Sequence, residues 1–187
     1  PRDPEIMRVA FYDHNTGQLF TEAFLPPTGG EVNIVPERTY DILVYNFDTE
    51  VTLIKDENDW TKILATTNTI SDAFKSKLKS RGTKSPMTDA DADKDEEIVY
   101  DPDHLFVGRL NEVNIPARSV DSPEITLRLD CKSVVRTWLL EVNNIKGAQY
   151  VASISAVITG LSQHYKIFTD LRSKEYVSVF FDVQRLD

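Results

Sequence analysis

Three aspartates at alternate positions are the residues best suited to metal chemistry: Asp89, Asp91 and Asp93. Alternating carboxylates are how a calcium-binding loop gathers its oxygen ligands. An EF-hand loop that began at Asp89 would need Gly at its sixth position and Glu at its twelfth, and the sequence has Lys94 and Tyr100 there. We therefore interpret residues 80–97 as an acidic, solvated surface loop rather than a specific calcium site, since such a composition buries too little apolar area to order itself strongly.

Sequence motifs for other chemistries are absent. The three histidines are far apart in sequence and do not share a close metal-ligand spacing: His14, His104 and His164. Cys131 is the one cysteine, so it can form neither an intramolecular disulfide nor a cysteine zinc site, and no Gly-x-Ser-x-Gly elbow occurs. Gly29-Gly30 is not followed by the Lys-Ser/Thr of a phosphate-binding loop. We predict no catalytic residue, no metal site and no cofactor.

Acidic and aromatic residues could also serve carbohydrate chemistry. Asp101 and Asp103 could supply the acid and base of a glycoside hydrolase, but Pro102 between them is typical of a turn that enters a strand at 105–109, with the carboxylates bonded to nearby backbone amides. Four aromatic residues could form a sugar-stacking platform: Trp60, Tyr100, Tyr150 and Tyr165. Because most aromatic side chains of a β-sandwich fill its core, we favour that role for them. The sequence therefore does not predict an enzyme.

The overall composition narrows the class of protein further. The 187 residues contain 21 Lys and Arg against 30 Asp and Glu, a formal net charge of −9, and are 41% hydrophobic, which is typical of a globular protein. The acidic balance argues against binding to nucleic acid, because that needs a clustered excess of cations. The basic stretch 75–84 is followed at once by the acidic loop. No apolar run approaches the ~18 to 20 residues of a spanning helix, and the N-terminal residues lack the hydrophobic core of a signal peptide.

Alternation of apolar and polar residues with period two dominates the chain. It is clearest at 125–129 and 177–183, and both stretches predict strands with one buried face. Residues 41–45 are apolar on both faces and predict a central strand. Less regular alternation predicts further strands at 7–12, 19–25, 31–35, 113–115, 134–142 and 150–158.

Turn residues separate these predicted strands. Asn15-Thr16-Gly17 is typical of a short hairpin loop, and the run 26–30 combines proline with glycine at the end of a strand. Helical periodicity is confined to 60–78, where we expect one helix or two short turns. Short strands joined by such turns predict an all-β protein with a short helical insertion, folded as an antiparallel β-sandwich. We expect residues 1–187 to form a single domain, since neither a repeat nor a shift in composition marks a boundary.

Three runs of sequence carry a family resemblance: 40–50, 100–106 and 150–162. The most distinctive piece is Tyr-Asn-x-Asp-Thr-Glu after a buried strand, in which Asn46, Asp48 and Thr49 are suited to tying down a strand-end turn through side-chain to backbone bonds. From about Met7 to Val183 the chain resembles a family of Bacteroidetes surface lipoproteins that has no established biochemical function. That family is similar to the fimbrillins and fimbrial anchor proteins, which are built from transthyretin-like β-sandwich domains.

This resemblance implies a location and an architecture. Family members begin with a lipoprotein signal and a lipidated cysteine, neither of which occurs in this sequence, and they commonly continue into a further β-rich region. The resemblance thus implies a cell-surface, outer-membrane lipoprotein whose membrane contact is an N-terminal lipid anchor. It also implies that this chain is the N-terminal part of a longer two-domain protein. No catalytic residue is carried over from the family.

From these observations we expect a non-enzymatic fimbria-like or adhesive protein that acts as a subunit, tip or anchor. Its partners would be other fimbrial subunits or surface proteins, joined by β-strand addition, in which an extended segment completes an exposed sheet edge. The alternating C-terminal strand, 176–183, is a candidate participant. The alternative is a surface module that captures glycan or host protein without polymerising. Its mark would be a cluster of exposed aromatic residues at one end of the sandwich that includes Trp60 or Tyr100.

Overall fold

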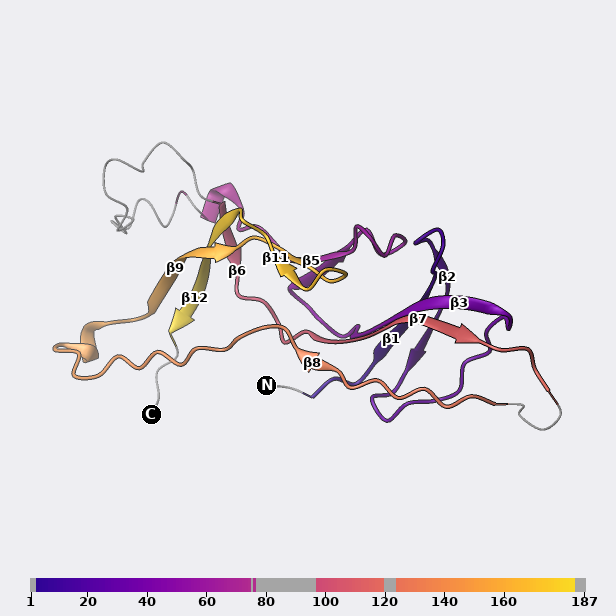
Figure 1. Ribbon diagram of the computed structural model, residues 1–187. Coiled ribbons are helices and arrows are strands. Elements are labelled where there is room, and N and C mark those ends of the chain that lie inside the picture. Colours follow the sequence, from indigo (N-terminus) through magenta and orange to yellow (C-terminus); the bar gives the residue numbers. More distant parts are fainter. Residues whose placement is uncertain (1–2, 75, 77–96, 120–123, 184–187) are drawn as a thin grey trace.

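The largest element of the fold is a five-stranded antiparallel sheet. The computed structural model describes residues 3–74, 76, 97–119 and 124–183, so the predicted acidic loop lies almost entirely outside the described residues. The sheet has the strand order β2-β1-β3-β7-β8 (Figure 1). Its strands are β1 (Met7–Asp13), β2 (Leu19–Leu25), β3 (Arg38–Asn46), β7 (Phe106–Ile115) and β8 (Lys132–Ser133).

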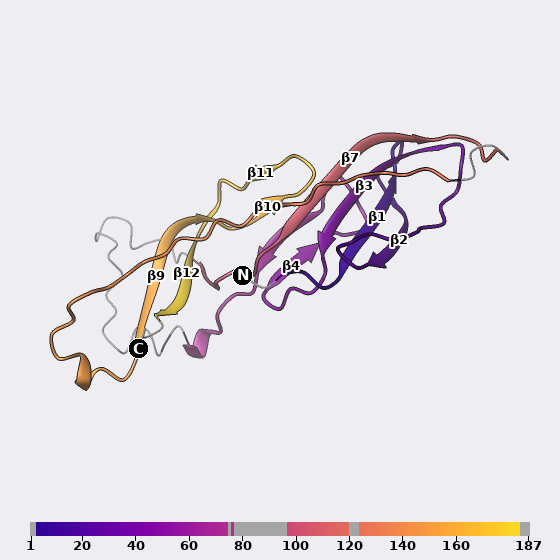
Figure 2. The same ribbon diagram turned by 90° about the horizontal axis from the view of Figure 1, so that it is seen from below.

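A four-stranded antiparallel sheet in the order β11-β10-β5-β4 lies over one face of the five-stranded sheet, and the two make a β-sandwich (Figures 1 and 2). The prediction of an all-β sandwich is therefore confirmed. The strands of this second sheet are β4 (Thr52–Lys55), β5 (Leu64–Thr67), β10 (Tyr165–Lys166) and β11 (Leu171–Arg172).

A three-stranded sheet lies beside the sandwich, with β9 as its outermost strand (Figures 1 and 2). Its central strand pairs in parallel with β6 and antiparallel with β9. The strands are β6 (Glu97–Tyr100), β9 (Ile154–Ser162) and β12 (Tyr176–Val183). The connection from β9 to β12 carries β10 and β11 back to the sandwich, so this sheet and the sandwich share one continuous stretch of chain.

Strand β3 is central because both of its faces are apolar. Tyr40, Ile42 and Val44 lie on one face of the sheet, Leu43 and Tyr45 lie on the other, and all five are buried. A strand that is buried on both faces must have neighbours along both edges and a covering layer above and below. The prediction of a central strand at 41–45 is confirmed, since β3 pairs with β1 and β7.

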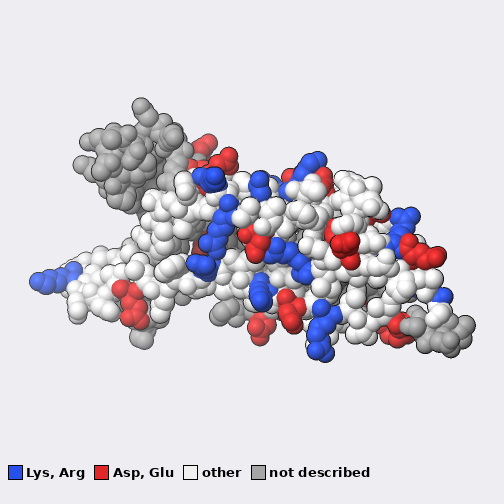
Figure 3. All heavy atoms as spheres, viewed as in Figure 1, with Lys and Arg blue, Asp and Glu red and all other residues white. Residues whose placement is uncertain are grey.

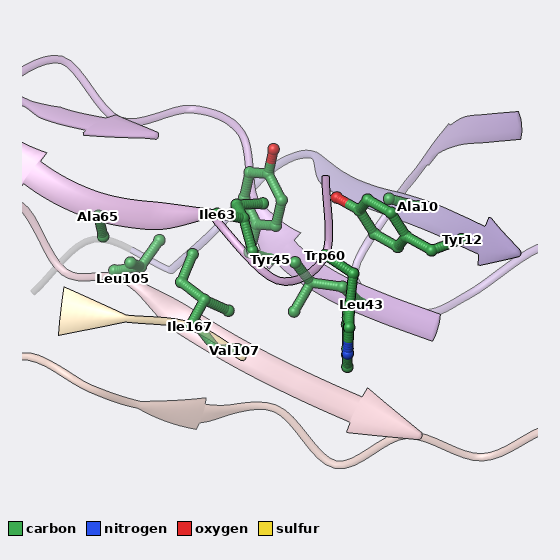
Figure 4. Packing of buried hydrophobic residues seen from close by; sticks show 10 residues of the cluster. All are labelled: Ala10, Tyr12, Leu43, Tyr45, Trp60, Ile63, Ala65, Leu105, Val107 and Ile167. Carbon is green, nitrogen blue, oxygen red and sulfur yellow. The ribbon is translucent and has the colours of Figure 1, made fainter. Parts of the chain in front are cut away.

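The core of the sandwich lies between its two sheets (Figure 4). It contains residues from both sheets and from the loops that close its ends. Trp60 lies in one such loop and packs on Tyr12 and Phe168, with ring centroids 5.4 and 5.0 Å apart. The ten buried members are Ala10, Tyr12, Leu43, Tyr45, Trp60, Ile63, Ala65, Leu105, Val107 and Ile167.

One buried charge lies at the edge of this core. Arg8 is almost fully buried, and its Nε donates to a Glu22 carboxylate oxygen at 2.6 Å. A second guanidinium nitrogen donates to the Tyr45 hydroxyl, which in turn donates to Glu57 at 2.8 Å. In this series of hydrogen bonds the guanidinium of Arg8 is paired with the carboxylate of Glu22 and with the Tyr45 hydroxyl, so it keeps its charge although it is buried. Burial also raises the pKa of Tyr45.

Three stretches differ from the secondary structure that the sequence predicts. Within 60–78, residues 64–67 form β5 rather than helix, and among the described residues of this stretch the helical ones are 72–74 and 76. The alternating stretches 31–35 and 125–129 belong to none of the three sheets, although the second had one of the clearest strand patterns. Between 134 and 142 there is likewise no strand, since β8 ends at Ser133. The strands that period two predicted at 31–35, 125–129 and 134–142 are therefore wrong.

Candidate interaction surfaces

Two of the three runs that carry the family resemblance, 40–50 and 100–106, meet where β3 ends and β7 begins, whereas the third, 150–162, lies mostly in β9 of another sheet. The Asn46 amide nitrogen donates to the His104 carbonyl at 3.1 Å and to Asp48 at 3.2 Å. The Asn46 amide oxygen accepts the Phe106 N–H at 2.8 Å. This one buried side chain thus ties two runs of sequence that lie 58 to 60 residues apart. The predicted structural role of Asn46 and Asp48 is confirmed.

Asp103 makes the second half of this junction. One of its carboxylate oxygens accepts three successive backbone N–H groups, those of Glu50, Val51 and Thr52, at 2.8, 2.5 and 2.9 Å. Thr49 closes the same turn by donating to the Thr52 carbonyl. The prediction that Asp103 bonds nearby amides is wrong about which amides these are, because they lie more than fifty residues earlier. Local turn chemistry could not reveal a contact that the strand order creates.

The two aspartates of this junction have different surroundings. Burial, with the neighbouring charge of Asp103, raises the pKa of Asp101, and a raised pKa suits a general acid. One oxygen of Asp103 is already occupied by the three amides. Asp103 therefore has a structural role at this junction.

The aromatic residues that the sequence singled out do not form one platform. Trp60 is only 2% exposed and belongs to the core, so the predicted core role is confirmed for it and it cannot contribute to the exposed cluster that the alternative module requires. The Tyr165 hydroxyl bonds to Arg109 and Asp170, which holds the β10–β11 connection against β7. Tyr100 on β6 is 40% exposed and Tyr150 is 86% exposed. Core packing explains Trp60, while Tyr100 and Tyr150 lie on the surface.

The titratable groups also show no metal centre. Among the described residues no three or more His, Cys, Asp or Glu side chains converge closely enough to hold an ion. Within that part of the chain, His14 bonds Asp41 at 3.0 Å and His164 faces Glu175 at 4.0 Å. The three aspartates at 89–93 lie outside the described residues. Burial raises the pKa of the Cys131 thiol, which is the opposite of what activates a nucleophile.

Charge is mixed over the face of the molecule shown in Figure 3. Lysines and arginines alternate there with aspartates and glutamates, and no continuous basic surface is visible among the residues drawn in colour. Arg8 does not contribute to this surface, because its side chain is buried. No described helix is long and apolar enough to cross a bilayer.

The outer face of the five-stranded sheet carries an apolar groove, on the side away from β4 and β5. The groove has a volume of about 1130 Å³. Its floor is made by side chains of adjacent strands: Met7, Val9, Phe11, Ile42 and Val44. These side chains belong to a second cluster of buried residues that is distinct from the core of the sandwich. The sheet is thus apolar on both faces, and one of them is only partly covered.

Two extended segments line this groove, residues 25–34 and 124–131. Figure 1 shows both on the same side of the five-stranded sheet. They include 31–35 and 125–129, the alternating stretches that join no sheet in the described part of the chain. Val32, Ile34 and Leu129 reach the floor, whereas Ile125 and Leu127 remain 47% and 37% exposed. Extended backbone beside an apolar groove is what an added strand needs for pairing.

The predicted participant in strand exchange, Tyr176–Val183, is not an edge. As β12 it is the central strand of its sheet, and Val177 and Val179 on it are buried. Seven of its residues pair with β9 and four with β6. The alternation that suggested an exchangeable strand therefore reflects burial within the chain, and the strands that border this sheet in the described part of the chain are β6 and β9.

Comparison with known proteins now adds to this geometry. Residues 1–182 match a family described as "Domain of unknown function (DUF5119)". The chain belongs to this family. It is also 32% identical over 186 residues to a protein of Bacteroides ovatus named "Putative fimbrium anchoring subunit Fim4B", a match that covers 98% of this chain and 49% of that protein. Fimbrial anchors are a non-enzymatic kind of protein.

A solved structure has the same architecture. It is a crystal structure described as a "putative adhesin" from Bacteroides ovatus, with a TM-score of 0.59 and 24% sequence identity. The match covers 98% of this chain and 57% of that one. At this identity the likeness establishes the fold. The family member described here thus spans about half the length of the relatives it matches.

Proposed function

We propose that this protein is a non-enzymatic component of a fimbria-like or adhesive assembly at the cell surface, either a subunit or an anchor, and that it joins a partner by β-strand addition. The observation that carries the proposal is the groove on the outer face of the five-stranded sheet, with its apolar floor and its unpaired, strand-like walls. The name of the relative Fim4B supports the fimbrial role.

An added strand suits this groove for two physical reasons. Alternate side chains of a strand point to the same face, so every second residue of an incoming strand would point into the groove, toward the exposed Ile125 and Leu127 of its wall. Each fully buried Val, Leu, Ile or Phe contributes about 1.5–3 kcal/mol. The backbone of the same strand could pair with the extended segments at 31–35 and 125–129. Main-chain pairing supplies affinity and the pockets for alternate side chains supply selectivity.

The proposal includes a location and an architecture. We propose that a lipid attached upstream of residue 1 holds the protein at the outer membrane, as the family resemblance implies. The partners would be other fimbrial subunits or surface proteins that supply the strand. The sandwich and its three-stranded extension would form one domain, the N-terminal part of a longer chain, in keeping with relatives about twice this length.

The test uses the full-length protein in its native cell envelope. Envelope extracts would be run on a denaturing gel with and without boiling and probed with antibody to this domain. Strand-exchanged assemblies should give a ladder that collapses on boiling. Ile125→Asp, on the exposed wall of the groove, should remove the ladder, because a buried charge would oppose the incoming strand. Leu171→Asp, on the exposed β11 away from the groove, is the matched control and should preserve it.

Two results would overturn the strand-addition proposal. The first is a ladder that Ile125→Asp leaves intact. The second is a single monomeric band in both lanes, with the protein still in the membrane fraction. In the second case a stand-alone module for glycan or host protein becomes the better account. Retardation of the protein in gels that contain soluble polysaccharide would then test it, with alanine at the exposed Tyr100 and Tyr150 as the variants.

A further inference from the structure

Residues 136–151 are the most exposed apolar stretch in the described part of the chain, and we call them the apolar arm. Leu139 is 86% exposed, Trp138 is 79% exposed and Leu140 is 61% exposed. The other large apolar side chains exposed on the arm are Val142, Ile145, Tyr150 and Val151. Figures 1 and 2 show a drawn-out backbone that leaves β8 and runs to the end of the molecule where β9 begins. Consecutive side chains of such a backbone point to opposite sides, so the arm is apolar and uncovered on both sides.

The backbone of the arm is also unpaired over most of its length. Residues 136–146 form no backbone hydrogen bond with any residue that the structure describes. Lipid could cover the side chains but could not satisfy these donors and acceptors, since hydrocarbon tolerates only backbone that is already paired. The edge of another sheet could cover the side chains and pair with the backbone. The arm therefore fits a protein partner that adds strands to it.

The position of the arm favours a partner within the same chain. Strand β12 ends at Val183, which pairs with Ile154, and Ile154 follows closely on the last residue of the arm. Figures 1 and 2 show this end of β12 at the same end of the molecule as the arm. The relative Fim4B is about twice as long, since the match covers 98% of this chain and 49% of that protein. Residues that follow β12 would start beside the arm, where a short connection gives them an effective concentration of about millimolar.

So large an apolar surface also needs a permanent cover. An uncovered patch of this kind leads to aggregation, and a partner that dissociates would leave the arm uncovered for part of the time. A covalently linked region is always at hand. The net charge of −9 on each chain opposes a second copy as the cover.

We propose that the apolar arm is the docking site for the region of the longer chain that follows residue 187, and that this region adds strands to it. Trp138, Leu139 and Leu140 then lie inside the interface between the two halves of one protein. Interfaces between permanently associated partners are more apolar than transient ones and are rich in aromatic side chains. The inference rests on the proposed architecture, in which this chain is the N-terminal part of a longer one.

The test measures amide hydrogen exchange in the full-length protein by mass spectrometry, on a fraction shown to be monomeric by light scattering. Amides at 136–146 should exchange roughly a hundredfold more slowly than in the denatured protein, because paired and covered amides are protected. Leu139→Asp should restore fast exchange, since it would bury a carboxylate at the interface. Leu139→Met keeps an apolar contact of similar volume and should keep the protection. Leu171→Asp, on the exposed strand β11, is the matched control and should leave the arm protected.

Three results would overturn the proposal. The first is fast exchange at 136–146 in the parent protein, a measurement that does not depend on how any variant folds. The second is protection that appears only in dimers or larger species, which would make a second copy or another subunit the cover. The third is full protection of the arm in Leu139→Asp while β3, which reports on the folding of each variant, stays protected. Ile125→Asp tests the groove and should leave the arm unchanged, so this inference and the strand-addition proposal can fail separately.

Discussion

The two faces of the five-stranded sheet are closed in different ways. The inner face lies against a second sheet, and the loop that carries Trp60 seals its end. The outer face is equally apolar, but two extended segments cover it without pairing and leave a groove of about 1130 Å³. Interiors are normally packed as densely as organic crystals. The outer face therefore differs from the inner one in having a cover that forms no sheet with it.

The strongest test of this difference uses adjacent residues of β3 that point to opposite faces. Leu43→Ala, on the sealed face, should cost about 3–5 kcal/mol of unfolding free energy, because the surrounding side chains cannot collapse into the cavity. Ile42→Ala removes a similar volume beneath the two segments that cover the outer face without pairing, which can settle into the cavity more easily than a sheet can, so it should cost about 2–3 kcal/mol. Denaturant unfolding of the two variants would measure the difference. Equal losses would mean that the groove is filled in solution.

The junction between β3 and β7 holds together two strands whose side chains contribute to both faces of the five-stranded sheet. Asp103→Ala removes the acceptor for three backbone amides and should cost about 2–3 kcal/mol, since bonds to a charged group contribute more than neutral ones. Asp101→Ala, two residues away, is the matched control and should cost less than about 1 kcal/mol. Thermal unfolding would rank the two. A reversed ranking would contradict the structural role of Asp103.

Substitutions that enlarge a side chain should also distinguish the two faces of the five-stranded sheet. Ala10→Leu adds volume to the sealed core and should cost about 1–3 kcal/mol through overpacking. Val44→Leu adds volume on the groove floor and should cost less than about 1 kcal/mol. The same denaturant measurement applies to both. If Val44→Leu were the more damaging, the outer face would be packed as tightly as the inner one.

The smallest expected effect concerns high pH. Burial raises the pKa of Tyr12 to about 12, above the ordinary value of 10.0. The unfolded phenol ionises first, so the stability that Tyr12 contributes is complete below pH 10 and is lost as the pH rises to about 12. Tyr12→Phe loses one hydrogen bond to the Glu57 carbonyl, about 1 kcal/mol at neutral pH, and should make unfolding less sensitive to alkali.

Tyrosinate absorbance and unfolding measured together would follow this effect. Tyr176→Phe changes an exposed ring and is the control. Part of the alkaline sensitivity should remain in Tyr12→Phe, because burial also raises the pKa of Tyr45. An unchanged alkaline transition in Tyr12→Phe would show that this face of the sheet is open to water.

Much of the fold could be predicted from the sequence because it rests on local patterns. Alternation predicted β1, β2 and β12, and the doubly apolar stretch 41–45 predicted the central strand β3. Strand β5 was missed because 60–78 has roughly helical spacing, whereas pairing with β4 and β10 decides its conformation. The buried position of Trp60 was predicted, because most aromatic side chains of a sandwich fill its core, but the exposure of Tyr100 and Tyr150 was not.

The candidate surfaces were harder to predict. The family motifs named the right residues at the β3–β7 junction, but the amides that Asp103 binds lie on a segment far away in sequence. The C-terminal strand was the expected edge, and the structure places it in the centre of its sheet. An alternating strand has the same sequence whether its neighbours are present or absent, so periodicity cannot distinguish an edge from a centre.

By itself the sequence determined that the chain is all-β and that β3 lies at the centre of a sheet, because side-chain alternation depends on neighbouring residues. Only the tertiary structure decided which apolar faces are sealed and which strands remain edges. Those properties depend on non-local pairing: the groove and the apolar arm exist because segments distant in sequence cover some apolar surface and leave the rest exposed.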